Sequence, residues 1–438
     1  MFECYTLRFA KAGLLLRTIH EDNERLDLVL ELQRFLIRRI SAAEKRTRRL
    51  KRLIAFRKKR LSAGHRLSKL EAKSIKRKIA QCEQSILDQR QLMFIWRCFG
   101  DGIAFSYQSK YSLKHLYYDG HYQVKADAGF MTANGRFKPG FRLEYRYLKL
   151  GIRMGVPVVM ADLTNVVRHG DICALGGPDP MPVEVKSSIN QNARTVRQAE
   201  NLRAITDFYH NDGAAFFRGI PNVRRIELQK PEISFEEAMN ECIDEALAKG
   251  IAVTSPEPGL HYIATFQPDC IDSFMHLLTP STLAVQLVPA ADWVPCIPFT
   301  LSLEPPHLTR FLQEKVALVV LIDLAYLKSL FASQGIHATM LLDGVSAIQI
   351  CLDPKNLMKG VFRISEGLFA RIALEFLSLA WFAEEFSIPL KEAPGTVAAE
   401  EFTSMSGFVS AIPEGWYDVP DCYDDAHQET APNRGVIT

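Results

Sequence analysis

Paired cysteines are missing from this sequence: none of its nine cysteines forms a CxxC pair or a cluster with histidine. A structural zinc site and a disulfide framework are therefore not expected, and the cysteines fit a reducing cytoplasm. The N-terminus lacks the positive start, apolar core and small-residue cleavage site of a secretory signal. The most apolar run, 316–330, is interrupted by Asp323 and Lys328 and is too short to span a bilayer. We therefore expect a cytoplasmic protein with no membrane partner.

A phosphate-binding GxxxxGK(S/T) motif is also missing, so we expect no ATP-driven translocation by this chain. The composition, 47% hydrophobic and 24% charged, is that of an ordinary globular protein. Since single cores rarely exceed about 300 residues, a chain of 438 residues is expected to hold two or three domains.

Acidic residues are almost missing between positions 34 and 78. This segment has 19 Lys or Arg and only Glu44 and Glu71, a net charge of +17, whereas the remainder has 34 bases and 48 acids. The overall charge of +3 therefore conceals a basic arm attached to an acidic body.

Proline is missing from positions 22–96, and Gly64 is the only glycine there. Apolar residues recur every three or four positions, which predicts helices, and Ser68 with Glu71 forms a potential capping box after the glycine. We therefore expect an antiparallel, coiled-coil-like helical hairpin.

The charge of the hairpin is either a solvated face or a surface for an anion. Facing like charges reduce helix stability unless an anion offsets them, and nucleic acid is the obvious anion. A homo-oligomer or a partner protein could also use the hairpin. The candidate nucleic-acid contacts are Arg48, Arg49, Lys51, Arg52, Lys58, Lys59 and Arg60.

The middle of the chain predicts a helix followed by a β-hairpin. Segment 100–140 is expected to be irregular or short β-structure, and 141–154 helical with Leu143, Tyr147, Leu150 and Met154 on one face. Segments 166–175 and 181–186 are predicted strands around a turn at 176–180.

Three side chains of this hairpin could carry chemistry. Side chains alternate along a strand, so Glu184 and Lys186 should share one face while Val183 and Val185 enter the other, and Asp171 could reach the first face from the neighbouring strand. Two close carboxylates repel unless a divalent cation lies between them, and oxygen ligands favour Mg²⁺ or Mn²⁺. Lys186 could orient or help to deprotonate a water beside a phosphate.

The tripeptide alone is unspecific, because Glu71-Ala72-Lys73 and Asp353-Pro354-Lys355 repeat it in a predicted helix and a predicted turn. Only the copy at Glu184 lies in a predicted strand, follows an aspartate-bearing strand and precedes a predicted helix, 194–210, and a strand, 214–218.

This order of elements and residues resembles the PD-(D/E)xK, or restriction-endonuclease-like, nuclease superfamily over about residues 100–225. The resemblance implies an αβββαβ core in which Asp171 and Glu184 bind Mg²⁺ and Lys186 is catalytic. It also implies a role for Gln198 on the following helix. The literal Pro178-Asp179 pair is too near Glu184 to lie on the preceding strand, and is interpreted as part of the turn.

Two further residues are candidates for the same site. Glu144 could match an accessory acid that some members use, although an exposed helical glutamate is the simpler interpretation. His169 could share the face of Asp171, or be an ordinary surface histidine.

The expected whole is a mixed α/β (α+β) chain: an N-terminal segment with the basic hairpin, 1–98; a nuclease-like domain, 99–225; a C-terminal α/β domain of unknown role, 226–390; and an acidic, partly disordered tail, 391–438. In the C-terminal domain a capping box at 234–237 should open a helix that ends at Gly250. Strands are expected at 262–266, 284–288, 317–322 and 347–351, and helices at 308–314 and 366–385.

The expected function is Mg²⁺-dependent hydrolysis of DNA or, second, RNA. Such modules are common in prokaryotic restriction, repair and phage defence, which gives the setting by analogy. Two alternatives remain: a catalytically silent nuclease-like fold that binds nucleic acid or assembles through the hairpin, and a coiled-coil scaffold in which the three residues coincide by chance.

Overall fold

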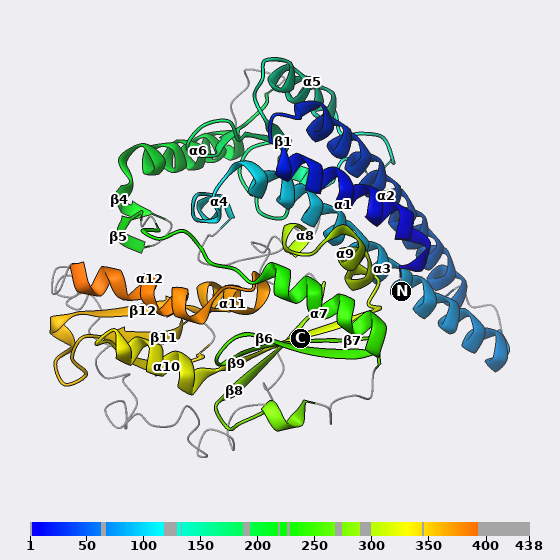
Figure 1. Cartoon of the computed structure of the whole chain (residues 1–438). Coiled ribbons are helices and arrows are strands. Elements are labelled where there is room, and N and C mark those ends of the chain that lie inside the picture. The colour runs from blue at the N-terminus through cyan, green and yellow to red at the C-terminus, as the bar shows by residue number, and fades with distance from the viewer. Residues whose placement is uncertain are drawn as a thin grey trace. The chain divides into compact units, whose positions relative to one another are not determined.

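The computed structural model is a mixed α+β protein that divides into two compact units (Figure 1). The N-terminal unit contains Cys4–Glu227 with Pro289–Leu301, and the C-terminal unit contains Leu228–Val288 and Ser302–Thr438 with Met1–Glu3. The expected domain limits within these units stay predictions. The structure describes residues 2–62, 67–117, 129–132, 134–186, 193–217, 220–225, 228–267, 274–289, 299–343 and 346–392, so the acidic tail lies outside the described residues from 393 on.

The predicted helical hairpin is confirmed. Helices α2 (Leu26–Ser62) and α3 (Lys69–Tyr107) pack along each other (Figure 1), and α1 (Thr6–Glu21) packs against both. Ser68 caps α3: its hydroxyl accepts from the Glu71 amide, and the Glu71 carboxylate accepts from the Ser68 amide at 2.9 Å. Below the arm, Trp96 is fully buried against Phe9, with ring centroids 4.8 Å apart.

The expectation of irregular structure from residue 100 is wrong for its first part. Helix α3 continues to Tyr107, and α4 follows at Lys110–Tyr117. The glycines that suggested a break serve close packing instead. A Cβ on Gly100 would lie 2.0 Å from the carbonyl oxygen of Leu163, and one on Gly102 would lie 2.4 Å from Leu16. Short β-structure is present near Gly135, whose φ is +76°, since Met131 and Phe137 form an antiparallel bridge around it.

The elements that follow come in the order helix, three strands, helix, strand. They are α5 (Phe141–Arg153), β1 (Val158–Met160), β2 (Ile172–Ala174), β3 (Met181–Val183), α6 (Ala193–Asn211) and β4 (Gly213–Phe217), with a 3₁₀ turn, η2, at Ala161–Leu163. Strands β1, β2 and β3 form an antiparallel sheet in that order, with Val159 opposite Cys173 and Cys173 opposite Pro182. Strand β4 pairs with β5 (Ile220–Arg224) in a separate ribbon.

The predicted strand 166–175 is wrong over most of its length, because only 172–174 lies in the sheet. Residues 165–166 are held by a different partner: the fully buried carboxylate of Asp101 accepts from the amides of Asn165 at 2.6 Å and Val166 at 3.0 Å. Val166 is buried all the same. The apolar residues of segment 166–175 therefore indicate burial around Asp101 and not pairing in a β-sheet.

Helix α5 begins at 141 and ends before Gly155, whose φ is +76°, as predicted. Its apolar stripe does not face the core, however. Tyr147 and Leu150 are 46% and 47% exposed and Met154 is 72% exposed, while Leu148 is fully buried. The helix contacts β1 and β2 through the face that contains Leu148.

The C-terminal unit contains two antiparallel sheets. One has the order β6-β7-β9-β8 and the other the order β10-β11-β12. Helix α7 (Glu236–Lys249) packs on β6 and β7. The bounds of the strands are Ile251–Glu257 (β6), Leu260–Thr265 (β7), Thr282–Leu287 (β8), Ala317–Asp323 (β9), His337–Met340 (β10), Ser346–Cys351 (β11) and Val361–Ser365 (β12). The remaining helices of the chain are α8 (Phe299–Ser302, of which only Ser302 belongs to the C-terminal unit), α9 (Pro305–Leu312), α10 (Leu324–Ser333), α11 (Glu366–Leu374) and α12 (Leu379–Glu392), with short 3₁₀ turns at Glu3–Tyr5, Met275–Leu277 and Leu357–Lys359.

The four strands predicted in this unit are confirmed, and two helix predictions are wrong in detail. Helix α7 has Phe235 as its N-cap and no side-chain cap, because Ser234 forms a β-bridge with Leu377. The predicted helix 366–385 is two helices, since Phe376 adopts a φ of +56°, which interrupts it. The end of α7 at Gly250 is confirmed.

Candidate catalytic site

The carboxylate of Asp171 lies against the backbone of the segment 184–186. The paired register of β2 and β3 ends at Ile172 and Val183. Beyond it the Asp171 amide donates to the Val183 carbonyl at 2.9 Å, and the Val185 amide donates to Asp171 Oδ2 at 2.8 Å. Val185 separates Glu184 from Lys186, so one hydrogen bond holds the aspartate beside both of the other predicted residues.

Gly170 explains why the chain can turn at this point. Its φ is +74°, which residues with a side chain rarely adopt, and a Cβ there would lie 2.9 Å from the backbone nitrogen and oxygen of Val183. The glycine thus brings the start of β2 close against β3, and Asp171 follows it directly.

Strand alternation does not describe this segment, which corrects one prediction. Strand β3 ends at Val183, so Glu184 and Lys186 lie just beyond it. Val183, expected in the interior, is 37% exposed, and Pro182 is buried in its place. The physical reason is that the side chain of Asp171 takes the Val185 amide hydrogen, which a continuing ladder would direct to a strand carbonyl. Glu184 is half-buried and Lys186 is exposed.

Glu144, on α5, belongs to the same electrostatic environment. It is half-buried and not an exposed helical glutamate. Its pKa is raised to about 7, first by burial and then by the negative charges of Asp171, Asp162 and Glu184, while Lys138 opposes the shift. Three carboxylates, from η2, from the residue before β2 and from the end of β3, therefore act on Glu144.

Asp162 is the residue that the sequence interpretation missed. It lies in η2, directly after β1, and its carboxylate is 3.6 Å from the ammonium nitrogen of Lys138. An acid at the end of a short apolar run, 158–160, was the available signal, because side chains at strand ends often line functional sites. The predicted hairpin, 166–186, does not include that strand.

The described residues contain no ready-made group of three or more acid, histidine or cysteine side chains placed to hold a metal ion. Mg²⁺ does not require one, since it commonly binds through one or two protein carboxylates and completes its shell with waters and phosphate oxygens. Asp171 and Glu184 are the residues predicted for that mode, and after burial their negative charges contribute to the raised pKa of Glu144.

Gln198 is half-buried on α6, which packs against β3. No hydrogen bond joins it to Asp171 or Glu184 in the part of the chain that the structure describes. His169 is half-buried in the bend before Gly170, where alternation with Asp171 does not apply.

Asp179, the aspartate of the literal Pro-Asp pair, has structural partners. The guanidinium of Arg225 forms a fork with its carboxylate, with nitrogen–oxygen distances of 2.6 and 2.9 Å, and the Ser112 hydroxyl donates to it at 3.1 Å. These contacts tie the β2–β3 turn to α4 and to the end of the unit's β-ribbon. Asp171 remains the aspartate beside the Glu184–Lys186 segment.

The seven basic residues predicted to contact nucleic acid have unequal environments. Arg48 is part of the fold: it is half-buried, donates to the Met131 carbonyl and lies 4.0 Å from Glu44. Lys58 forms an ion pair with Glu83 across the hairpin at 3.4 Å. The other five are exposed, namely Arg49, Lys51, Arg52, Lys59 and Arg60.

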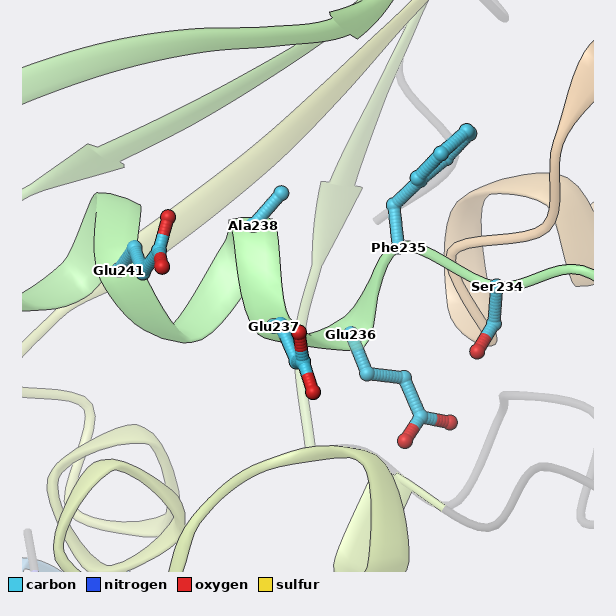
Figure 2. A pocket seen from close by; sticks show the side chains of 6 residues that line it. All are labelled: Ser234, Phe235, Glu236, Glu237, Ala238 and Glu241. Atoms are coloured by element: carbon cyan, nitrogen blue, oxygen red, sulfur yellow. The ribbon is translucent and has the colours of Figure 1, made fainter.

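The C-terminal unit has a hollow of about 480 Å³ at the first turn of α7, lined by Ser234, Phe235, Glu236, Glu237, Ala238 and Glu241 (Figure 2). Glu236 and Glu237 extend from that turn, where negative charge stabilises a helix N-terminus. Glu236 and Glu237 thus have a structural explanation, and the six lining residues include no cation.

None of the described helices is long and apolar enough to cross a membrane. Comparison of the chain with models of protein families, with curated proteins and with solved structures finds no match.

Proposed function

We propose that this protein is a Mg²⁺-dependent nuclease that hydrolyses phosphodiester bonds of DNA, with RNA as the second candidate substrate. Asp171 and Glu184 are the proposed metal ligands, and Lys186 is the proposed catalytic cation. The observation that supports this most is the hydrogen bond from the Val185 amide to the Asp171 carboxylate, which holds Asp171 against the backbone between Glu184 and Lys186.

The chemistry follows from the charges. A divalent ion between Asp171 and Glu184 would polarise a phosphate and lower the pKa of a bound water. Lys186 is exposed and forms no ion pair within the described residues, so its ammonium group is available to a phosphate oxygen or a water. The Val185 amide fixes one oxygen of Asp171 and thereby orients the carboxyl group.

Asp162 adds negative charge around Glu144, and Glu144 adds its own once it ionises above about pH 7. Both charges would favour a cation at the site. Gln198 is retained as a supporting residue of this proposal by virtue of its position on α6, beside β3.

The test is cleavage of supercoiled plasmid, linear duplex and single-stranded substrates, with Mg²⁺ and with EDTA. Glu184→Ala and Lys186→Ala should each lower the cleavage rate by roughly 100-fold or more, the usual scale for a catalytic group. The control is the copy of the tripeptide in the C-terminal unit: Asp353→Ala and Lys355→Ala remove an acid and a lysine of the same spacing from the turn after β11 and should keep full activity.

Full activity in both site variants refutes the assignment of the centre. If the unaltered protein binds nucleic acid but cuts none of the three substrates with Mg²⁺ or Mn²⁺, the catalytically silent alternative replaces the nuclease.

A further inference from the structure

The outer face of α2 carries a continuous row of exposed cations. Successive residues of a helix are rotated by about 100°, so positions within about 60° of Phe56 share one face. We call this row the basic stripe; it consists of Arg38, Lys45, Arg49, Arg52, Lys59 and Arg60, all exposed. Arg38 and Arg60, its first and last members, are 22 positions apart, or about 33 Å along the helix.

The opposite side of α2 is the packed side. Leu36, Ile40 and Thr47 are buried and lie about 160–200° from Phe56 by the same rotation. Lys51 and Lys58 lie near that side, and Lys58 is paired with Glu83 of α3. The structure thus separates the stripe from two lysines that the sequence grouped with it, and adds Arg38 and Lys45.

The inner end of the stripe is attached to the sheet that carries the candidate site. Arg34, on the same face, donates from Nε to the Tyr145 hydroxyl at 2.8 Å, and Tyr145 follows Glu144 on α5. One residue earlier, the buried side-chain amide of Gln33 donates to the Val158 carbonyl at 2.7 Å and accepts from the Met160 amide at 3.0 Å. A nucleic-acid strand bound along the stripe would therefore reach α5, the helix that contains Glu144.

Phe56 is an aromatic residue inside this row, and it is 68% exposed. Arg52 precedes it by one turn and Arg60 follows it by one turn, so a cation lies on each side of the ring. An exposed ring between cations gains little from a duplex, whose base faces are already stacked. It gains a partner from an unpaired base, which stacks on aromatic side chains while phosphates meet the cations.

We propose that the basic stripe with Phe56 is a binding track for single-stranded nucleic acid, along which the chain is delivered to the carboxylates of the proposed nuclease centre. The delivery step rests on the proposed function, whereas the binding step does not. The stripe cations contact phosphates, and Phe56 stacks on one base.

Two other occupants fit the face less well. A second copy of the arm would bring two basic faces together, which like charges oppose. A membrane-surface helix needs a broad apolar face, but the exposed large apolar side chains of α2 are Phe56 and, at 37%, Leu53, and both lie among cations.

The test measures binding of the full chain, without divalent cations, to an oligothymidylate and to a DNA duplex of equal length by fluorescence anisotropy over a series of salt concentrations. Arg49→Gln with Arg52→Gln should reduce the salt slope for the single strand by about 1.4, since each phosphate contact contributes about 0.7. The matched pair Lys51→Gln with Lys58→Gln removes the same charge from the other side of the helix and should change the slope much less.

Phe56→Ala should weaken binding of the single strand by roughly 5- to 150-fold, the scale of one lost stacked base, with the salt slope unchanged and duplex binding unaffected. Phe56→Trp should restore the affinity. Equal weakening for single strand and duplex, or no weakening, overturns the stacking role, and equal slope changes in the two double variants overturn the assignment of the face.

Two further outcomes separate the proposals. Binding to phosphatidylserine vesicles that Arg49→Gln with Arg52→Gln abolishes, without binding of oligothymidylate, overturns the track in favour of a membrane surface. If Glu184→Ala leaves cleavage intact while Phe56→Ala weakens binding, the proposed centre fails and the track stands; if Glu184→Ala abolishes cleavage while the stripe variants bind normally, the track fails and the centre stands.

Discussion

Replacing Glu144 by glutamine should make the stability of the N-terminal unit less dependent on pH. Glu144 is half-buried on α5, and its pKa of about 7 reflects burial first and then the charges of Asp171 and Asp162. Glutamine has nearly the same shape and never ionises, so the variant removes the charge while it keeps the packing.

The sign follows from the direction of the shift. The folded protein holds the Glu144 proton up to about pH 7, whereas the ordinary pKa of 4.5 applies in the unfolded chain. Its contribution to stability is therefore fully present below pH 4.5 and is lost as the pH rises through 7. The full difference corresponds to about 3 kcal/mol, and solvent screening of a partly exposed carboxyl reduces it to roughly 1–2 kcal/mol.

Urea unfolding of both proteins in EDTA, at about pH 5 and about pH 8, measures this difference. Glu144→Gln should raise the free energy of unfolding by roughly 1–2 kcal/mol at the higher pH and change it little at the lower pH. Glu200→Gln, an exposed site on α6, is the control and should leave the pH dependence unchanged. If Glu144→Gln keeps the pH dependence of the unaltered protein, burial and the neighbouring carboxylates do not raise the pKa of Glu144 as described.

Three further substitutions test the surroundings of the site. Gly170→Ala should reduce stability by roughly 1–3 kcal/mol and lower cleavage more than binding, because its Cβ would contact the Val183 backbone and displace Asp171; normal activity by the cleavage assay would contradict this. Gln33→Leu should cost about 2–4 kcal/mol in urea unfolding, since two hydrogen bonds to the edge of β1 are lost, and a neutral result would show that water replaces them. Asp101→Ala should cost roughly 3–5 kcal/mol in the same assay because the buried amides of Asn165 and Val166 lose their acceptor, whereas a loss below about 1 kcal/mol would mean that the loop reorganises.

The hairpin could be predicted from sequence because its signals are local. Helical periodicity, the lack of proline and the cap at Ser68 all depend on residues within one or two turns of each other, and each is present in the structure. The helix at Gly100 and Gly102 was not predicted, for the opposite reason. Their role depends on Leu163 and Leu16, which approach from distant parts of the chain.

The candidate site could be predicted only as a set of residues. The types and order of Asp171, Glu184 and Lys186 were visible, but their arrangement depends on a backbone turn at Gly170 and on a side-chain hydrogen bond to Val185. The alternation of side chains along an assumed strand predicts neither the turn nor the hydrogen bond. Asp162 was not predicted as a site residue because its electrostatic effect on Glu144 arises only when η2 and α5 meet in space.

The basic arm shows the same division between charge and geometry. The excess of cations is a property of composition, and no folding was needed to infer an anionic partner. Which cations act together depends on the helix face, and rotation along α2 separates Arg49 and Arg52 from Lys51 and Lys58 although all four lie within ten residues. Because the buried positions of α2 fix the inward face, the outward one follows, and Phe56 falls in the middle of it. The exposure of that ring is therefore imposed by the packing of the hairpin, which is why its partner must come from outside the fold.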